Sequence, residues 1–263
     1  MSVADKFRVV MAEGYTIRSV EDGIYSVLSD QPHTHLYDGR AGVYDLVVGT
    51  RIYNRVMWGA SMPDYVAFAE QAVASNSTGI LLDAGCGSLL FTAQAYLVCQ
   101  RPILACDQSL NMLRRARSRL MKLAGYLPEQ IFLLQADLNA LPFRPASFST
   151  VLCMNVLHHL ADGKGLLCSL KKLLAADGHL YLTSLVKGSR LIGDYYLDAL
   201  YKRGDFVRPR TGEELEALLV GSFGENVSYT KQGNMAYVDW FDNKTIDTFG
   251  GLFGDIDTKF DAI

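Results

Sequence analysis

The chain has 263 residues, 49% of them hydrophobic and 20% charged, so it can bury the core of a large α/β domain and is not a disordered or fibrous protein. Its 25 Lys and Arg residues against 28 Asp and Glu residues give a formal net charge of −3, which lacks the positive field that recruits nucleic acid or anionic lipid. Apolar runs such as 151–157 are shorter than the ~18 residues of a membrane span, and residues 1–30 lack a signal-peptide pattern. We therefore expect a cytoplasmic protein without a membrane span.

The cysteines point to neither a disulfide framework nor a zinc site, because their number is odd, their surroundings are apolar and no CxxC spacing occurs. We expect reduced thiols in the core. The five are Cys86, Cys99, Cys106, Cys153 and Cys168.

Between residues 80 and 186, short apolar runs alternate with longer stretches of helical period, the pattern of parallel strands joined by helical crossovers. The runs are continuously apolar, as strands buried on both faces should be. We expect strands at 80–82, 102–106, 131–134, 148–154 and 179–186. Helices are expected over 89–98 and from the N-cap Ser109 to Gly125.

The flanking segments differ from this α/β core. We expect 1–75 to be a helical lead-in, 76–240 the main domain and 241–263 a loosely packed tail rich in Gly and Asp. Within the main domain, 187–210 should form an insertion with an amphipathic helix over 191–201. Thr211 and Glu214 then predict a capping box, and 226–240 alternates like a hairpin.

Three consecutive strands each end in an aspartate, namely Asp83, Asp107 and Asp137. Ligands of open parallel sheets bind beyond the carboxyl ends of the strands, so these side chains should outline one crevice. Asp83 precedes the glycine turn at Gly85 and Gly87, which lets the backbone approach a ligand closely. Asp107 can accept hydrogen bonds from ribose hydroxyls, and Asp137 can accept one from an exocyclic amine. Any one of them alone could be an ordinary loop residue or a helix cap.

What is missing narrows the choice of nucleoside. A pyrophosphate cofactor requires G-x-G-x-x-G, and after Gly85 and Gly87 the chain has Leu90 where the third glycine belongs. No G-x-x-x-x-G-K-[ST] sequence occurs. A phosphate-free adenosine cofactor remains, and S-adenosyl-L-methionine (SAM) fits.

At this point the sequence resembles a known family. The stretches 81–87, 106–113, 135–143 and 155–160 are similar to the successive motifs of class I SAM-dependent methyltransferases, most of all the type 11 branch that includes ubiquinone and menaquinone C-methyltransferases. The resemblance implies a Rossmann-like seven-stranded α/β sheet with helices on both faces, a lead-in that covers the cofactor and a helical insertion after strand five. Two positions depart from the pattern: Leu89 replaces a glycine, and Ser149 replaces an aspartate.

The resemblance also implies roles. The loop at Gly85 and Gly87, preceded by Asp83, would pass the methionine part of SAM, and Asp107 with its neighbour Gln108 would hold the ribose. Asp137 and the Leu138 backbone would read the adenine, and Asn155 would lie beside the sulfonium. In the lead-in, Tyr37 and Tyr44 are candidates to pack against the methionine chain or the sulfonium, since tyrosine faces attract cations. Alternatively, these tyrosines only attach the lead-in to the domain.

The adjacent histidines His158 and His159 do not suggest a metal site, because neighbouring residues on a strand point to opposite faces and no further ligand stands at a suitable spacing. His159 is the candidate catalytic residue, since a neutral imidazole facing the acceptor could take its proton. A structural, hydrogen-bonded histidine is the alternative. The basic run 114–119 should be the solvated face of a helix that buries Leu113, Ala116, Leu120 and Leu123.

The acceptor is expected to be a small molecule, apolar or aromatic. The Asn-Pro-Pro-Tyr/Phe element of methyltransferases that act on adenine or glutamine amino groups is absent. In the helix at 191–201, Tyr195 and Tyr196 lie on an apolar face, and we predict that one of them contacts the acceptor. A SAM-binding regulator without turnover and an RNA methyltransferase remain alternatives. The sequence does not indicate the oligomeric state.

Overall fold

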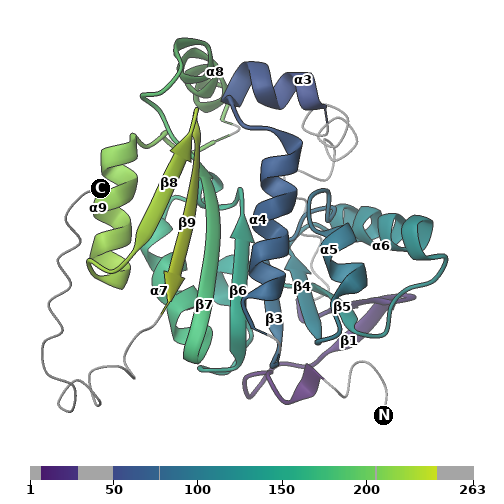
Figure 1. Ribbon diagram of the computed structural model, residues 1–263. Helices are drawn as coiled ribbons and strands as arrows, with labels where there is room; N and C mark the ends of the chain where they lie inside the picture. Colours follow the sequence, from purple (N-terminus) through teal and green to yellow (C-terminus); the bar gives the residue numbers. More distant parts are fainter. Residues whose placement is uncertain (1–6, 29–49, 77, 205, 242–263) are drawn as a thin grey trace, which may run out of the picture.

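The computed structural model describes residues 7–28, 50–76, 78–204 and 206–241. Within them, a nine-stranded sheet carries helices on both faces (Figure 1). Its strand order is β1-β2-β5-β4-β3-β6-β7-β9-β8. The strands are β1 (Arg18–Glu21), β2 (Ile24–Ser26), β3 (Leu81–Ala84), β4 (Ile103–Asp107), β5 (Ile131–Gln135), β6 (Phe148–Met154), β7 (Leu174–Leu185), β8 (Ser228–Gln232) and β9 (Met235–Phe241).

The five predicted parallel strands and the predicted hairpin are confirmed. β5, β4, β3, β6 and β7 pair in parallel, and the β8–β9 hairpin adds antiparallel to β7. These seven strands form the expected Rossmann-like sheet. The α/β class is therefore correct, but the number of strands in the sheet is nine rather than seven.

The two additional strands come from the lead-in, which was expected to be helical. β1 and β2 form a hairpin around Asp22 and Gly23, where Gly23 has a φ of 72°, and β2 pairs in parallel with β5. Ile24 is fully buried there, so the hairpin extends the apolar sheet at its edge. The helical part of the lead-in consists of α3 (Arg51–Tyr53), the π-helix η1 (Asn54–Trp58) and α4 (Met62–Ala74).

The remaining helices connect the strands. They are α5 (Ala93–Val98), α6 (Leu110–Ala124), α7 (Gly163–Leu173), α8 (Leu191–Lys202) and α9 (Gly212–Phe223), with 3-10 turns η2 (Leu138–Ala140) and η3 (Leu157–His159). The predicted caps are present: the Ser109 side chain accepts a hydrogen bond from Met112 N, Gly125 ends α6 in the left-handed conformation, and Thr211 and Glu214 form a capping box.

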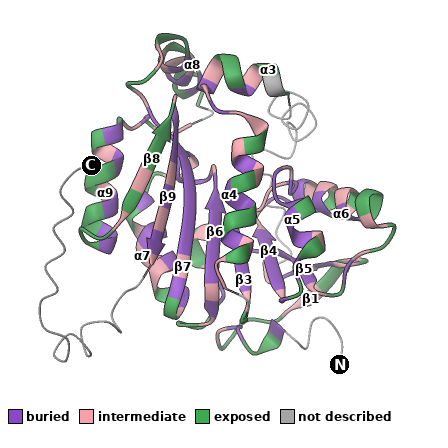
Figure 2. Ribbon diagram, in the orientation of Figure 1, coloured by how far each residue is buried: buried purple, intermediate pink, exposed green. Residues whose placement is uncertain are grey.

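Each face of the sheet is covered by its own helices. α4, α5 and α6 bury their apolar side chains on one face, while α7 and α9 bury theirs on the other; α4 crosses in front of the sheet in Figure 1 and α7 lies behind it. The central strands are almost entirely buried, as the purple ribbon in Figure 2 shows. All five cysteines are free thiols; three are buried, and Cys86 and Cys168 are partly exposed.

Two details of the helices differ from the prediction. The helix after β3 begins at Ala93 rather than at Leu89, because Leu89 has a φ of 55°, which no α-helix accommodates. In α6, Leu123 is 47% exposed, and Met112 is buried with Leu113, Ala116 and Leu120.

Candidate functional site

A pocket of about 290 Å³ opens at the carboxyl ends of β3, β4 and β6. In a parallel sheet this edge is where ligands bind. Its walls come from four places: the glycine turn after β3, the end of β4 with the start of α6, η2, and the segment from β6 into η3. The lining residues are Asp83, Gly85, Cys86, Gly87, Ser88, Leu90, Phe91, Thr92, Asp107, Gln108, Ser109, Met112, Leu138, Met154, Asn155, Val156, His159 and Leu160.

The glycine turn brings the backbone to the pocket in a conformation that needs glycine. Gly85 has a φ of 80° and Gly87 a φ of 54°. A Cβ at Gly85 would lie 2.3 Å from the side chain of Val156, so any larger residue would force Val156 to move. Leu89, where the methyltransferase pattern has a glycine, adopts the same left-handed region with a φ of 55°, and its side chain is fully buried. The backbone at this position therefore has a conformation that glycine adopts readily.

Asp107 fixes this turn to the end of β4. Its carboxylate accepts hydrogen bonds from Gly87 N (2.9 Å) and from Ser109 N (2.8 Å). Each carboxylate oxygen has a second lone pair, so Asp107 can accept ribose hydroxyls as well. The adjacent Gln108 also lines the pocket.

Asp137 is placed differently from the other two aspartates. Its Oδ1 accepts hydrogen bonds from Asn139 N and Asn139 Nδ2, both at 2.9 Å, and so caps η2. Leu138 lines the pocket and Asp137 does not. The role of Asp137 in adenine recognition remains a prediction.

Asn155 ends the strand β6 and enters the pocket wall. Its φ of 59° is a left-handed conformation that asparagine tolerates better than most residues. The neighbouring strand β7 holds it there. Thr183 Oγ1 donates a hydrogen bond to Asn155 Oδ1 at 3.1 Å, and the same Thr183 oxygen accepts one from the Asn155 backbone N–H.

Asp83 is a buried carboxyl at the floor of the pocket. It is 1% exposed and accepts one hydrogen bond, from the hydroxyl of Tyr96 on α5 at 2.8 Å. Burial raises its pKa to about 7, and the neighbouring Asp107 acts in the same direction while the Tyr96 hydrogen bond opposes it. A buried carboxyl with a single hydrogen-bond donor suits a ligand that brings N–H donors.

The two histidines lie in η3 and not on a strand, so the prediction that their rings diverge is wrong. In this 3-10 turn the ring centroids are 4.3 Å apart, and the ring of Phe206 packs edge-on against both of them. His158 is buried, and its Nδ1 accepts a hydrogen bond from Leu185 N at 3.4 Å. Burial, together with His159 and Arg210, lowers the pKa of His158 well below its usual range, so this imidazole is neutral.

His159 is the histidine that lines the pocket. The turn thus separates the buried His158 from His159, which lines the pocket. Among the residues that the structure describes, no group of three or more His, Cys, Asp or Glu side chains is placed to hold a metal ion.

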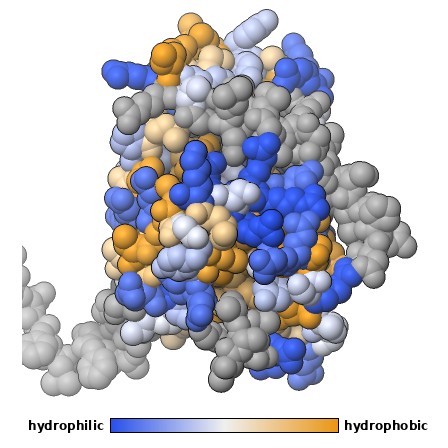
Figure 3. All heavy atoms as spheres, turned by 90° about the vertical axis from the view of Figure 1, so that its right-hand side faces the viewer, coloured by the Kyte–Doolittle hydropathy of each residue, from blue (hydrophilic) through white to orange (hydrophobic). Residues whose placement is uncertain are grey.

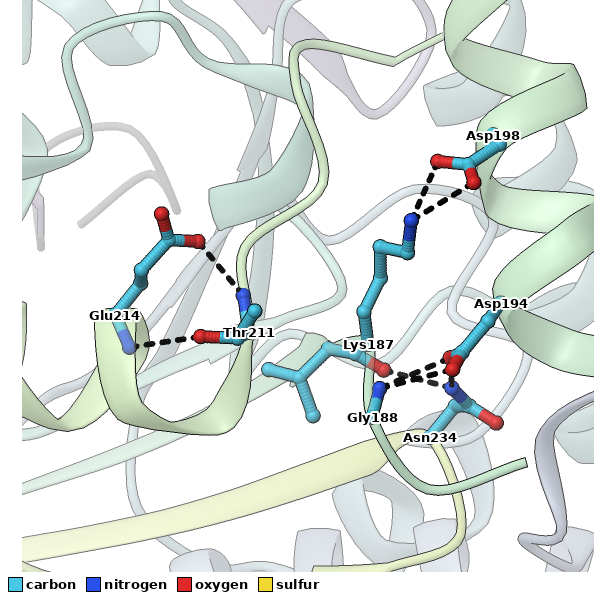
Figure 4. Close-up of polar contacts among 8 residues, drawn as sticks. Lys187, Gly188, Asp194, Asp198, Thr211, Glu214 and Asn234 are labelled. Atoms are coloured by element: carbon cyan, nitrogen blue, oxygen red, sulfur yellow. Dashed lines mark hydrogen bonds and ion pairs between the residues drawn. The ribbon is translucent and has the colours of Figure 1, made fainter. Parts of the chain in front are cut away.

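The insertion helix α8 is fixed to the rest of the protein at its first turns. Lys187 Nζ contacts both carboxylate oxygens of Asp198 at 2.7 and 2.8 Å, and Asp194 accepts from Gly188 N and from Asn234 Nδ2 (Figure 4). Tyr195 is 79% exposed on this helix.

Tyr196 packs against Tyr53 and Trp58 of the lead-in, with ring centroids at 6.2 and 5.6 Å. Neither Tyr195 nor Tyr196 is among the residues that line the pocket. Contact between these tyrosines and an acceptor remains a prediction. Tyr37 and Tyr44 lie outside the described residues.

The basic side chains of α6 are on its solvent side, and hydrophilic atoms gather where α6 lies in Figure 3. Several are engaged by the protein itself: Arg114 forms an ion pair with Glu21 of β1, Arg117 donates to Asp22 O, and Arg119 donates to Ser88 O. They connect the lead-in hairpin and the glycine turn to the domain.

Sequence reasoning missed several pocket residues. Phe91 and Thr92 were assigned to a helix that in the structure begins only at Ala93, because no sequence pattern marks the turn at Leu89. Met112 and Met154 also line the pocket, as does Ser109 beside its role as a cap. The bond between Tyr96 and Asp83 joins residues 13 positions apart and has no local signature.

Known proteins with similar sequences are methyltransferases. Residues 82–182 match the methyltransferase domain family. A curated relative, the ubiquinone biosynthesis O-methyltransferase of Xanthomonas euvesicatoria pv. vesicatoria (strain 85-10), is 29% identical over 140 residues, which are 49% of this chain and 56% of that protein. The chain thus matches little more than half the length of this relative.

Solved structures show the same fold. A phosphoethanolamine N-methyltransferase 2 of Haemonchus contortus in complex with SAM has a TM-score of 0.58 at 19% identity, over 75% of this chain and 44% of that one. An S-adenosylmethionine-dependent methyltransferase of Mesorhizobium loti has a TM-score of 0.50 at 19% identity, over 66% of this chain and 95% of that one. In the described part of the chain, none of the helices combines the length and the apolar character needed to cross a membrane.

Proposed function

We propose that this chain, which has the class I SAM-dependent methyltransferase fold and a methyltransferase domain at residues 82–182, transfers a methyl group from SAM to a small, largely apolar or aromatic acceptor. The observation that carries the proposal is the pocket at the carboxyl edge of the sheet, where Asp107 and the glycine turn lie together. The curated relative and the SAM-bound neighbour have names that point to different acceptors, so the acceptor class rests on this chain's own pocket.

The residues present suit each part of SAM. Asp107 would accept the ribose hydroxyls, Leu138 would pack on the adenine, and the turn at Gly85 and Gly87 would pass the methionine chain. The buried carboxyl of Asp83 would face its ammonium group. SAM supplies a methyl group bonded to a positively charged sulfur, which is already an activated leaving group.

The chain's own contribution is then mostly positioning. Holding two reactants in line can lower a barrier by about 7–11 kcal/mol. Asn155, fixed by Thr183, would set the position of the sulfonium end, and Phe91, Met154 and Leu160 give the adjoining wall an apolar surface that suits an apolar acceptor. His159, at the same wall, would take the proton that the acceptor gives up.

The lead-in and the insertion would complete the acceptor side. We propose that 1–75 covers the cofactor site and that 187–210 shapes the acceptor pocket. Tyr195 is available to an acceptor because it is exposed, whereas Tyr196 would act through its packing with Tyr53 and Trp58. Tyr195→Ala and Tyr196→Ala, each assayed for cofactor and acceptor binding separately, test this.

The proposed function is tested in two steps. Mass spectrometry of the purified protein should find co-bound SAM or its demethylated product, and incubation of a cell extract with methyl-deuterated SAM should then yield labelled small molecules. Asp107→Asn is the control that should strongly reduce both. His159→Gln should lower turnover more than it changes SAM affinity. SAM binding without a labelled product would instead favour a regulator, and labelled RNA would contradict a small-molecule acceptor.

A further inference from the structure

The buried carboxyl of Asp83 is unusual in having no cation beside it. It is 1% exposed, it lines the pocket, and the Tyr96 hydroxyl, itself fully buried, is its hydrogen-bond donor at 2.8 Å. A buried carboxylate normally requires a counter-charge or several donors. Here one donor is present, which leaves the carboxyl under-stabilised in its charged form.

The titratable groups around Asp83 make the charged form less stable. Tyr96 faces it from α5, Asp107 and Cys106 from β4, Cys86 from the glycine turn and Cys153 from β6. None of these five is a cation, and Asp107 adds a second negative charge. The burial and the like charge together raise the pKa of Asp83 to about 7.

The pocket beside Asp83 can hold what the carboxyl lacks, because Asp83 is one of the residues that line it. A primary ammonium group, with three N–H donors and a positive charge, would give Asp83 both further donors and a counter-charge.

We propose that Asp83 holds a proton in the empty pocket and releases it to solvent when the ammonium group of SAM enters, with Tyr96 as the positioning residue that orients the carboxyl. The inference rests on the proposed function, because SAM supplies the ammonium. The balance is simple: the O–H bond of the Asp83 carboxyl breaks, the proton goes to the buffer, and the carboxylate forms an ion pair with the ammonium.

Because Asp83 releases a proton when SAM binds, the affinity for SAM should depend on pH. Because the proton must leave for SAM to bind, affinity should fall as pH decreases through the pKa of the carboxyl. With that pKa at about 7, the Kd should be about fivefold weaker at pH 6.0 than at pH 7.0. About 0.9 proton should be released per SAM bound at pH 6.0, and about 0.5 at pH 7.0.

Isothermal titration calorimetry with SAM, in buffers of different ionisation enthalpy, counts these protons directly. The titrations stay at or below pH 7.0, because a free α-amino group itself titrates at about 7.7–8.0. S-adenosylhomocysteine, which retains the ammonium, should release the same number of protons as SAM. 5′-Methylthioadenosine, which lacks the ammonium, should release close to none.

Variants separate Asp83 from the other groups. Asp83→Asn should remove the proton release. Tyr96→Phe removes the hydrogen bond that favours the charged form, so at pH 7.0 its proton release should rise from about 0.5 toward one and its Kd should weaken. Tyr181→Phe changes another buried tyrosine outside the pocket lining and should leave both values unchanged.

Proton release near zero at pH 6.0 in the wild-type protein, or release that persists in Asp83→Asn, would overturn the inference while SAM binding itself stood. If SAM does not bind to the wild-type protein at all, the proposed function fails first.

Discussion

The side chain of Leu89 has two opposing effects on the stability of the protein. Its φ of 55° is strained for a leucine by about 1–2 kcal/mol, so glycine would relieve that strain. Its side chain is fully buried, and truncating a buried leucine costs about 2–5 kcal/mol. Burial is the larger effect. Leu89→Gly should therefore destabilise the protein by about 2–3 kcal/mol, although it restores the residue that the family has there.

The matched control is Leu89→Ala, which removes the burial but keeps a Cβ in the strained conformation. The methyl group that alanine retains, at about 0.8 kcal/mol, nearly offsets the strain that glycine relieves, so the two variants should be equally stable to within about 1 kcal/mol. Urea denaturation measures both. Because the backbone already has the glycine-like shape, SAM affinity should change less than threefold in Leu89→Gly. A Leu89→Gly protein as stable as wild type would refute the packing role of this side chain.

Three further predictions concern buried polar groups. Asp107→Asn should weaken SAM binding by about 2–3 kcal/mol in calorimetry, since the amide cannot accept from Gly87 N, Ser109 N and the ribose together; unchanged affinity would exclude Asp107 as the ribose ligand. Arg101→Met should cost about 3–5 kcal/mol of unfolding free energy, because four hydrogen bonds that the buried guanidinium donates, to two backbone carbonyls and two hydroxyls, would be lost; a loss below 1 kcal/mol would contradict this. The raised pKa of Asp83 means that its stabilising contribution is present at low pH and is lost as pH rises toward and through about 7, so the ligand-free protein should lose about 2 kcal/mol from this group between pH 5.5 and 8.5. Asp83→Asn should not show that loss in urea denaturation, and identical pH profiles would contradict it.

The sequence was informative wherever local chemistry decides the structure. The five parallel strands are continuous apolar runs, and the ends of α6 and α9 are set by capping residues such as Ser109 and Thr211. The glycine turn and Asp107 could be placed because both follow strands directly. These features depend on residues close together in the chain.

Other features depend on contacts that no local pattern shows. β1 and β2 have four and three residues, too few for a clear alternation, although the Asp22–Gly23 pair between them is a hairpin signal that could have identified them. His158 and His159 share a 3-10 turn because the chain bends after Asn155, a left-handed residue. The partner of Asp83 is a tyrosine on the next helix, and Thr92 lines the pocket only because the helix starts late.

A crystal structure of the protein with S-adenosylhomocysteine would show whether the pocket binds the cofactor. The nucleoside should lie at the carboxyl ends of β3, β4 and β6, with the ribose hydroxyls bonded to Asp107, the adenine against Leu138 and the ammonium beside Asp83. A nucleoside bound elsewhere, or no binding at millimolar concentration, would contradict it.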